Sequence, residues 1–376
     1  FGPADVTNSQ AIITSYSPYR PFTSIQESGL YIKELENSEL TYEKKHELNI
    51  GADMGFLNNR INLAVDWYKR NNYDLIGIVN TQGAGGQILK YANIASMKSH
   101  GIEFTLSTKN IKTKDFNWNT DFIFSNAKNE VTDLKQNANV MELISGNGFA
   151  KQGYPVRGLF SIPFVGLDKD GIPVIINEKG EATSTDINFQ ERQNTGFLKY
   201  EGPTDPTITG SLGNMFSYKG FRLNLFITYS FGNVIRLNPV FKAYYSDLTA
   251  MTREFKNRWT LPGDEAKTNV PAILSKRMYD SNEDLKYAYN AYNYSTERIA
   301  KGDFIRLKEI SLAYDFPKAW INPLKLTDLS LKVQATNLFL IYADDKLNGQ
   351  DPEFFNAGGV ASPVPRQFTI TLRLGL

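Results

Sequence analysis

Most of this chain follows a two-residue repeat of apolar and polar side chains. In the last segment, for example, Phe368, Ile370 and Leu372 alternate with Thr369 and Thr371. Such alternation is typical of a β-strand with one apolar face. Nine segments show it, at residues 48–56, 61–68, 102–107, 116–125, 207–218, 221–232, 304–316, 329–336 and 368–376. The sequence therefore predicts an all-β protein with nine strands.

Two of these segments are less regular than the others. Residues 207–218 are rich in glycine, and the alternation in residues 304–316 slips phase around Lys308 and Glu309. An extra residue in one strand produces a slip of this kind. We therefore predict a β-bulge at residues 308–309.

The links between the strands alternate strictly between short and long. Short links fall at residues 57–60, 112–115 and 219–220, with a slightly longer one at 317–325. Long links fall at residues 77–95, 133–202, 233–299 and 342–362. In an up-and-down sheet this places every short turn at one end and every long loop at the other, as in transmembrane barrels. A soluble sandwich has no reason to sort its loops by end.

The two faces of the predicted strands differ as membrane strands require. One face is apolar over roughly 9–11 residues, the length of a tilted membrane strand. The other face carries charges, which suit a water-filled lumen and are costly against lipid. We predict that the lumen-facing charges are Asp66, Glu103, Asp121, Arg222, Lys332 and Arg373. Aromatic residues gather near the strand ends, as in the interfacial girdles of barrels. The predicted fold is a transmembrane antiparallel up-and-down β-barrel.

Nine strands do not close a barrel neatly, because bacterial single-chain barrels use even numbers of strands. Residues 1–40 precede the first predicted strand and have the character of a long outer loop. An unclosed edge in lipid would leave backbone groups unpaired. We therefore expect further strands, which an N-terminal portion absent from this chain would supply.

Composition excludes several classes of function. The chain has 41 Lys and Arg against 40 Asp and Glu, a net charge of +1, which does not suit a nucleic-acid interface. It has no cysteine, and its two histidines, His46 and His100, have no partners at a metal-binding spacing. No nucleophile elbow, phosphate loop or dinucleotide fingerprint is present. The sequence predicts no enzymatic function and no cofactor.

Two acidic segments are candidates for cation binding. Asp168 begins a stretch that resembles a calcium loop, but its twelfth position is Lys179, so we predict an Asp-Gly turn there. The second segment is irregularly spaced and leaves a metal site as an open alternative; it contains Asp344, Asp345, Asp351 and Glu353. We predict no metal site in either segment.

Several longer stretches occur in the order of a known family. They are ENSELTYEKKHELNIGADMGFLNNRINLAVDWYKRNNYDLI (36–76), NIASMKSHGIEFTLSTKN and its continuation (93–134), GYPVRGLFSIPFVGLDKDGIPV (153–174), GDFIRLKEISLAYDFPKAW (302–320), LKVQATNLFLI (331–341) and DPEFF to PVPRQFTITLRLGL (351–376). Together they cover most of the chain. They resemble the C-terminal half of SusC/RagA-type TonB-dependent outer-membrane transporters.

The resemblance implies a plugged barrel of about 22 strands. Residues 1–376 would then be the C-terminal portion of the barrel, with its last nine strands, and the plug would lie in the absent N-terminal half. The family imports oligosaccharides or oligopeptides across the outer membrane, beneath a SusD-like surface lipoprotein and with energy delivered through TonB. The resemblance also implies contact with outer-membrane lipid and a dimer of transporter–lipoprotein pairs.

Two other functions remain open from the sequence. A soluble or surface-bound β-sandwich could bind glycans without transporting them. A passive porin would need neither a plug nor a partner and would conduct ions freely. Loop sorting and lipid-sized apolar belts favour the importer over the sandwich.

The link at residues 233–299 is rich in aromatic residues and is the best candidate for ligand contact. Tyrosine offers a rigid face to sugar rings or peptide side chains at a low entropy cost. The predicted ligand-binding residues are Tyr244, Tyr245, Tyr287, Tyr289, Tyr292 and, from another loop, Arg157. The alternative is that these residues pack the loop on itself or against a lid. Within the link, residues 246–259 have helical character.

Overall fold

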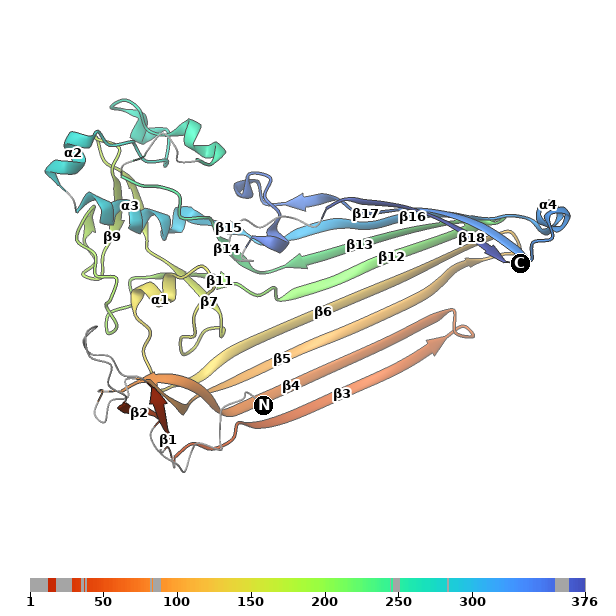
Figure 1. The fold of residues 1–376 in the computed structure, drawn as a ribbon, viewed down its shortest axis with the longest axis horizontal. Helices are drawn as coiled ribbons and strands as arrows, with labels where there is room; N and C mark the ends of the chain where they lie inside the picture. Colours follow the sequence, from red (N-terminus) through yellow and green to blue (C-terminus); the bar gives the residue numbers. More distant parts are fainter. Residues whose placement is uncertain are drawn as a thin grey trace.

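The computed structural model describes residues 13–17, 29–34, 37, 39–81, 83, 89–243, 245, 251–282, 284–355 and 365–375. Within them, one antiparallel sheet contains nine strands whose spatial order follows the sequence (Figure 1). Its strands are β3 (Lys44–Phe56), β4 (Ile61–Asn80), β5 (Leu89–Lys112), β6 (Phe116–Leu134), β12 (Ile208–Tyr218), β13 (Phe221–Phe231), β16 (Phe304–Asp315), β17 (Asp328–Ala343) and β18 (Gln367–Gly375). The nine predicted strands and their up-and-down order are confirmed.

Short turns join the strands at one end of the sheet, and the long connections leave from the other end (Figure 1). The turn between β12 and β13 has two residues, Lys219 and Gly220, with φ of 44° and 90°. Positive φ at both positions gives a hairpin turn whose twist matches that of the strands. A side chain at Gly220 would also press on the carbonyl oxygen of Asp315. The position of the short turns at one end and the long connections at the other confirms the predicted sorting of the loops by end.

The prediction of a long loop at residues 77–95 is wrong, because most of this segment is strand. β4 and β5 have 20 and 24 residues and run well past their neighbours. Their register shifts between Asn72 and Leu75 and again before Ile76. These shifts interrupt the alternation that marks a strand, which is why the sequence pattern stops too early.

A row of aromatic side chains crosses the apolar face at the turn end of the sheet. Its members lie opposite one another in successive strands and are Phe116, Tyr218, Phe221 and Tyr314. In the next row, the rings of Trp118 and Phe216 stack with their centroids 5.6 Å apart. Such rows form the girdle of a membrane barrel at the level of the lipid headgroups.

The apolar face of the sheet has no second layer packed on it in the described part of the chain. Leu312 on β16 lies opposite Val333 on β17, and they are 48% and 46% exposed. A soluble sandwich would bury these residues against another sheet. The structure therefore disagrees with the sandwich alternative and leaves this face free for lipid.

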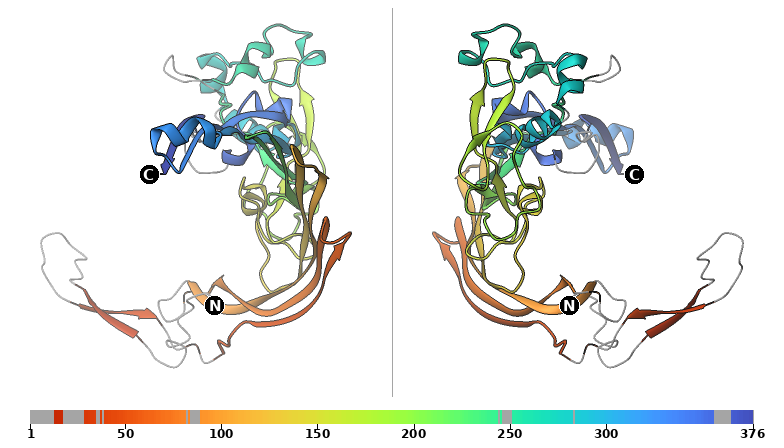
Figure 2. Two further views of the ribbon diagram at one scale, coloured as in Figure 1. Left: turned by 90° about the vertical axis from the view of Figure 1, so that its right-hand side faces the viewer. Right: turned by 90° about the vertical axis from the view of Figure 1, so that its left-hand side faces the viewer.

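The long connections form a loop layer at the other end, which we define as the described parts of residues 135–207, 232–303 and 344–355. Figure 2 shows the curved sheet with this layer. Its strands are β7 (Gly158–Ser161), β8 (Phe164–Leu167), β9 (Pro173–Ile176), β10 (Ala182–Thr183), β11 (Lys199–Pro203), β14 (Val234–Arg236) and β15 (Ile299–Lys301). Its helices are α1 (Val140–Ile144), η3 (Arg253–Asn257), η4 (Asp264–Ala266), α2 (Lys276–Ser281), α3 (Leu285–Asn293), η5 (Thr296–Arg298), η7 (Asp345–Leu347) and η8 (Pro352–Phe354).

The hydrophobic core lies in this loop layer and not within the sheet. One cluster joins α1 to β7 and β9, and includes Leu143, Phe160 and Ile175. A second cluster joins α3 to the segment around Phe241. The long connections are therefore ordered by their own buried side chains, as compact functional loops are.

Other elements lie outside the sheet and the loop layer. They are the hairpin β1 (Ile13–Ser17) with β2 (Gly29–Glu34), and α4 (Lys318–Ile321) with η6 (Asn322–Leu324) in the turn before β17. Of the helix predicted at residues 246–259, residues 246–250 lie outside the described residues, and the described part contains only η3. No helix in the described segments has the length and apolar character needed to cross a membrane.

Candidate ligand cavity at the loop end of the sheet

The register places all six predicted lumen charges on the polar face of the sheet. Asp66 lies directly opposite Glu103 in the neighbouring strand. The others on this face are Asp121, Arg222, Lys332 and Arg373. Arg222 contacts the Asp315 carboxylate at 2.8 Å, with both side chains about half exposed. Their position on one face agrees with the prediction, and their contact with a water-filled lumen remains a prediction.

The predicted bulge in β16 is confirmed next to this face. Leu307 pairs with Ile227 and Glu309 pairs with Phe226, so Lys308 has no partner in β13. A bulge of this kind redirects a side chain and increases the local twist. It lies near the loop end of the strand, where the sheet meets the loop layer.

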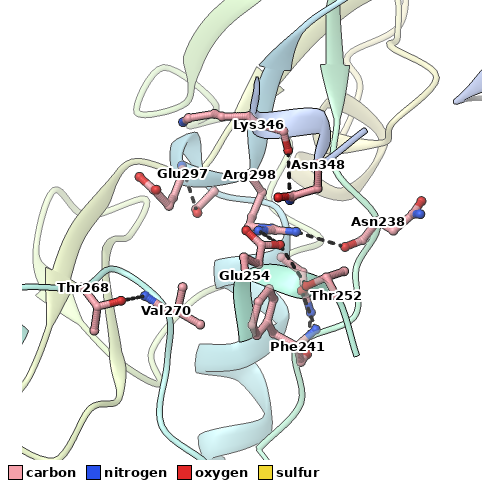
Figure 3. Close-up of polar contacts among 12 residues, drawn as sticks. Asn238, Phe241, Thr252, Glu254, Thr268, Val270, Glu297, Arg298, Lys346 and Asn348 are labelled. Carbon is pink, nitrogen blue, oxygen red and sulfur yellow. Dashed lines mark hydrogen bonds and ion pairs between the residues drawn. The ribbon is translucent and has the colours of Figure 1, made fainter. Parts of the chain in front are cut away.

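Two buried arginines hold the loop layer together at the loop end of the sheet. Arg298 is 2% exposed and donates to the Glu254 carboxylate at 2.7 Å (Figure 3). This ion pair joins η3 to η5. The Arg298 guanidinium also lies 4.8 Å from the Phe241 ring centroid. Arg236 donates to the carbonyl oxygens of Phe160 and Ser295 at 2.6 and 3.2 Å.

Burial lowers the pKa of Arg236 to about 9, and the nearby Glu201 carboxylate opposes this shift. The side chain stays charged at neutral pH and spans β7, β14 and the start of η5. Charge-assisted hydrogen bonds from one guanidinium to several carbonyls fix segments that are distant in sequence. Arg236 therefore holds β7, β14 and the start of η5 together within the loop layer.

The structure separates the predicted ligand tyrosines into two groups. Tyr289 and Tyr292 are each 1% exposed within the second cluster, and burial raises the pKa of both. The Tyr289 hydroxyl donates to the Ala272 carbonyl oxygen at 2.7 Å. These two side chains pack the loop on itself, as the packing alternative expects, and are covered where a ligand would have to reach them.

The other predicted tyrosines lie closer to the surface or outside the described residues. Tyr287 on α3 is 39% exposed. Tyr245 packs its ring edge-on against Phe255 and accepts a hydrogen bond from the Lys242 amide. Tyr244 is the one that falls outside the described residues. Tyr245 and Tyr287 stay predicted ligand contacts.

The hydroxyl of Tyr289 gives a direct test of this division. Tyr289→Phe leaves the Ala272 carbonyl unsatisfied, and we expect it to lower the stability of the loop layer by about 1–3 kcal/mol. Tyr287→Phe, in the same helix, should change stability by less than about 0.5 kcal/mol because its side chain is exposed. Thermal unfolding of the two variants measures the difference, and equal melting temperatures would contradict the assignment.

A cavity of about 620 Å³ opens where β12, β13 and β16 meet the loop layer. Its walls combine polar-face strand residues with charged loop residues. They include Thr209, Thr228, Ser230, Arg157, Thr204, Asp205, Asn233, Lys308, Phe304 and Glu353. A volume of this size and a wall with a few polar groups are typical of small-ligand sites. We call it the mouth cavity.

Arg157 is the predicted ligand residue that lines the mouth cavity. Its guanidinium donates to the Asn147 carbonyl oxygen at 3.0 Å and to the Asp205 carboxylate at 2.7 Å. The side chains of Arg157 and Asp205 are 45% and 50% exposed. This pair therefore presents both a cation and an anion to the cavity.

In the acidic segment near residue 351, two carboxylates form ion pairs with the side chain of Arg306, which the sequence did not indicate as a partner. Arg306 contacts Asp351 at 2.5 Å and Glu353 at 3.2 Å, and Asp344 caps η7. No group of three or more His, Cys, Asp and Glu side chains in the described segments is arranged to hold a metal. The Asp-Gly turn at Asp168 is confirmed, with Gly171 at φ 74° between β8 and β9.

Comparison with known proteins identifies similar barrels. No family model matches the chain. TonB-dependent receptor P3 of Formosa agariphila is 25% identical over 91% of the chain and 34% of the receptor. SusC of Bacteroides thetaiotaomicron, a TonB-dependent receptor, is 26% identical over 90% of the chain and 32% of SusC. The chain spans about a third of the length of these relatives.

The structure of the RagAB peptide transporter superimposes with a TM-score of 0.74, at 23% identity, over 97% of the chain and 38% of that chain. The chain resembles SusC/RagA-type TonB-dependent transporters. The nine-stranded sheet of this SusC/RagA-like chain is a section of an outer-membrane β-barrel wall. All three of these similar proteins are named as receptors or transporters.

Proposed function

We propose that this chain belongs to an outer-membrane importer of nutrient oligomers, either oligosaccharides or oligopeptides. The mouth cavity carries this proposal, because it joins the loop layer to the polar face of the wall at three strands. A molecule bound there would lie at the entrance of the lumen. The mixed charges of Arg157, Asp205, Lys308 and Glu353 suit the recognition of a polar molecule.

The similarity to SusC and RagAB supports three further parts of the proposal. Residues 1–376 form the C-terminal portion of the barrel, and the plug lies elsewhere in the protein. A SusD-like lipoprotein covers the loop layer, and two transporter–lipoprotein pairs form a dimer. TonB supplies the energy through the N-terminal half. Exposed residues of the loop layer, such as Tyr287, are available to the ligand or to the lid.

Uptake experiments on cells test this function. Cells that make the complete protein should accumulate radiolabelled oligosaccharides or oligopeptides, whereas cells without its gene should not. Collapse of the proton gradient with a protonophore should stop accumulation, because the energy that TonB delivers comes from the gradient across the inner membrane. Uptake that persists with the protonophore, together with free ion conductance in planar bilayers, would favour a passive porin instead.

A further inference from the structure

We propose that the mouth cavity contains a carboxylate-binding site centred on Lys308, which fixes one end of the imported molecule. This inference rests on the proposed import function and adds to it the chemistry of the ligand. Lys308 lines the cavity and is the residue that the bulge in β16 leaves without a partner in β13. The extra residue thus lines the same cavity as Thr228, Ser230 and residues of the loop layer.

The other charges at the cavity are already paired. Arg157 contacts Asp205 at 2.7 Å, and Glu353 contacts Arg306 at 3.2 Å. No carboxylate of the described residues lies within 4.0 Å of Lys308, whereas Lys332 further along the face reaches Glu309. Lys308 is therefore the cation of this wall that a ligand can engage without breaking an existing ion pair.

The surroundings of Lys308 favour an anionic ligand group over a neutral one. The cavity is recessed and Lys308 is half-buried, so a carboxylate there is screened less than on an open surface. Charge-assisted hydrogen bonds to an ammonium are about twice as strong as neutral ones. A neutral sugar hydroxyl would gain less from the same contact.

The acids of the cavity limit how many carboxylates a ligand can carry. Asp205 and Glu353 are both partly exposed on the wall, with side chains 50% and 38% exposed. A second ligand carboxylate near either of them would be repelled. The site therefore favours a molecule with one carboxylate, such as the end of an oligopeptide, over a polyanion with a charge on every unit.

Binding to the complete protein, purified in detergent, tests the site. One pair of probes is a pentapeptide library of Gly, Ala, Ser and Val with free C-terminal carboxylates and the same library with C-terminal amides. A second pair is trigalacturonate and its methyl ester. The free peptides should bind about tenfold more tightly than the amides, the value of one charge-assisted contact. Lys308→Met should abolish this preference, and Lys308→Arg should keep it.

The controls separate this site from general damage and from the import function. Lys332→Met, on the same face but outside the cavity wall, should leave the preference unchanged. Trigalacturonate carries a carboxylate on every unit and should bind no more tightly than its ester, so a preference for it that depends on Lys308 overturns the inference of a site for a single carboxylate. A carboxylate preference that survives Lys308→Met, or the absence of the peptide preference in wild type, also overturns the inference. Uptake by cells would still decide the import function in that case.

Discussion

Replacing Arg306 with methionine is expected to lower the free energy that holds η8 against the sheet by about 3–5 kcal/mol. The side chains of Arg306 and Asp351 are 6% and 9% exposed and lie 2.5 Å apart. Without the guanidinium, the buried Asp351 carboxylate has lost its cation, and Glu353 loses the same partner. Hydrogen exchange at residues 345–355 of the purified protein measures the loss as faster exchange.

Two comparisons make this result specific to the buried ion pair. The double variant with Arg306→Met and Asp351→Asn should exchange more slowly than the single variant, because the unpaired charge is gone. Arg222→Met breaks an exposed pair with Asp315 and should cost less than about 1 kcal/mol. Exchange of η8 at the wild-type rate in Arg306→Met would show that the pair does not hold this segment.

The second large effect is expected at Gly210 in β12. Its neighbour Tyr229 extends its ring across Gly210, and the Tyr229 hydroxyl donates to the Ile123 carbonyl oxygen at 2.9 Å. A methyl group at Gly210 would overlap both the Tyr229 hydroxyl and that carbonyl oxygen. Gly210→Ala should therefore lower the free energy of unfolding by about 1–3 kcal/mol, as overpacking does. Denaturant unfolding of the purified barrel measures it.

Gly213 provides the matched control in the same strand. A methyl group there would lie 3.6 Å from the Phe226 ring, an ordinary contact distance. Gly213→Ala should leave stability unchanged or slightly higher, because alanine loses less backbone entropy than glycine. Similar destabilisation by both substitutions would mean that the strand, and not the Tyr229 ring, excludes side chains.

The sheet could be predicted from the sequence because its signal is local. Alternation marks each strand, and the length of each link shows which end of the sheet it occupies. The bulge at Lys308 was visible for the same reason. The extensions of β4 and β5 were not, because the register shifts near Leu75 break the alternation on which the prediction depends.

The mouth cavity could be predicted only in part. Arg157 was found in a stretch that resembles the family, but its partner Asp205 lies 48 residues away. Arg306 and Asp351 are 45 residues apart, and nothing in the sequence links them. For the tyrosines, residue type suggested ligand contact, but burial decides it, and burial of Tyr289 depends on how α3 packs in the loop layer.

The placement of the core in the loop layer has a consequence for how the molecule responds to heat. The nine-stranded sheet is held by backbone hydrogen bonds between strands and by its lipid or detergent shell. The loop layer relies instead on buried side chains such as Phe241 and Ile144. We therefore expect the two regions to melt as separate cooperative units. Calorimetry should record a first transition in which the loop layer unfolds while the barrel stays intact, and a second transition at higher temperature in which the barrel unfolds.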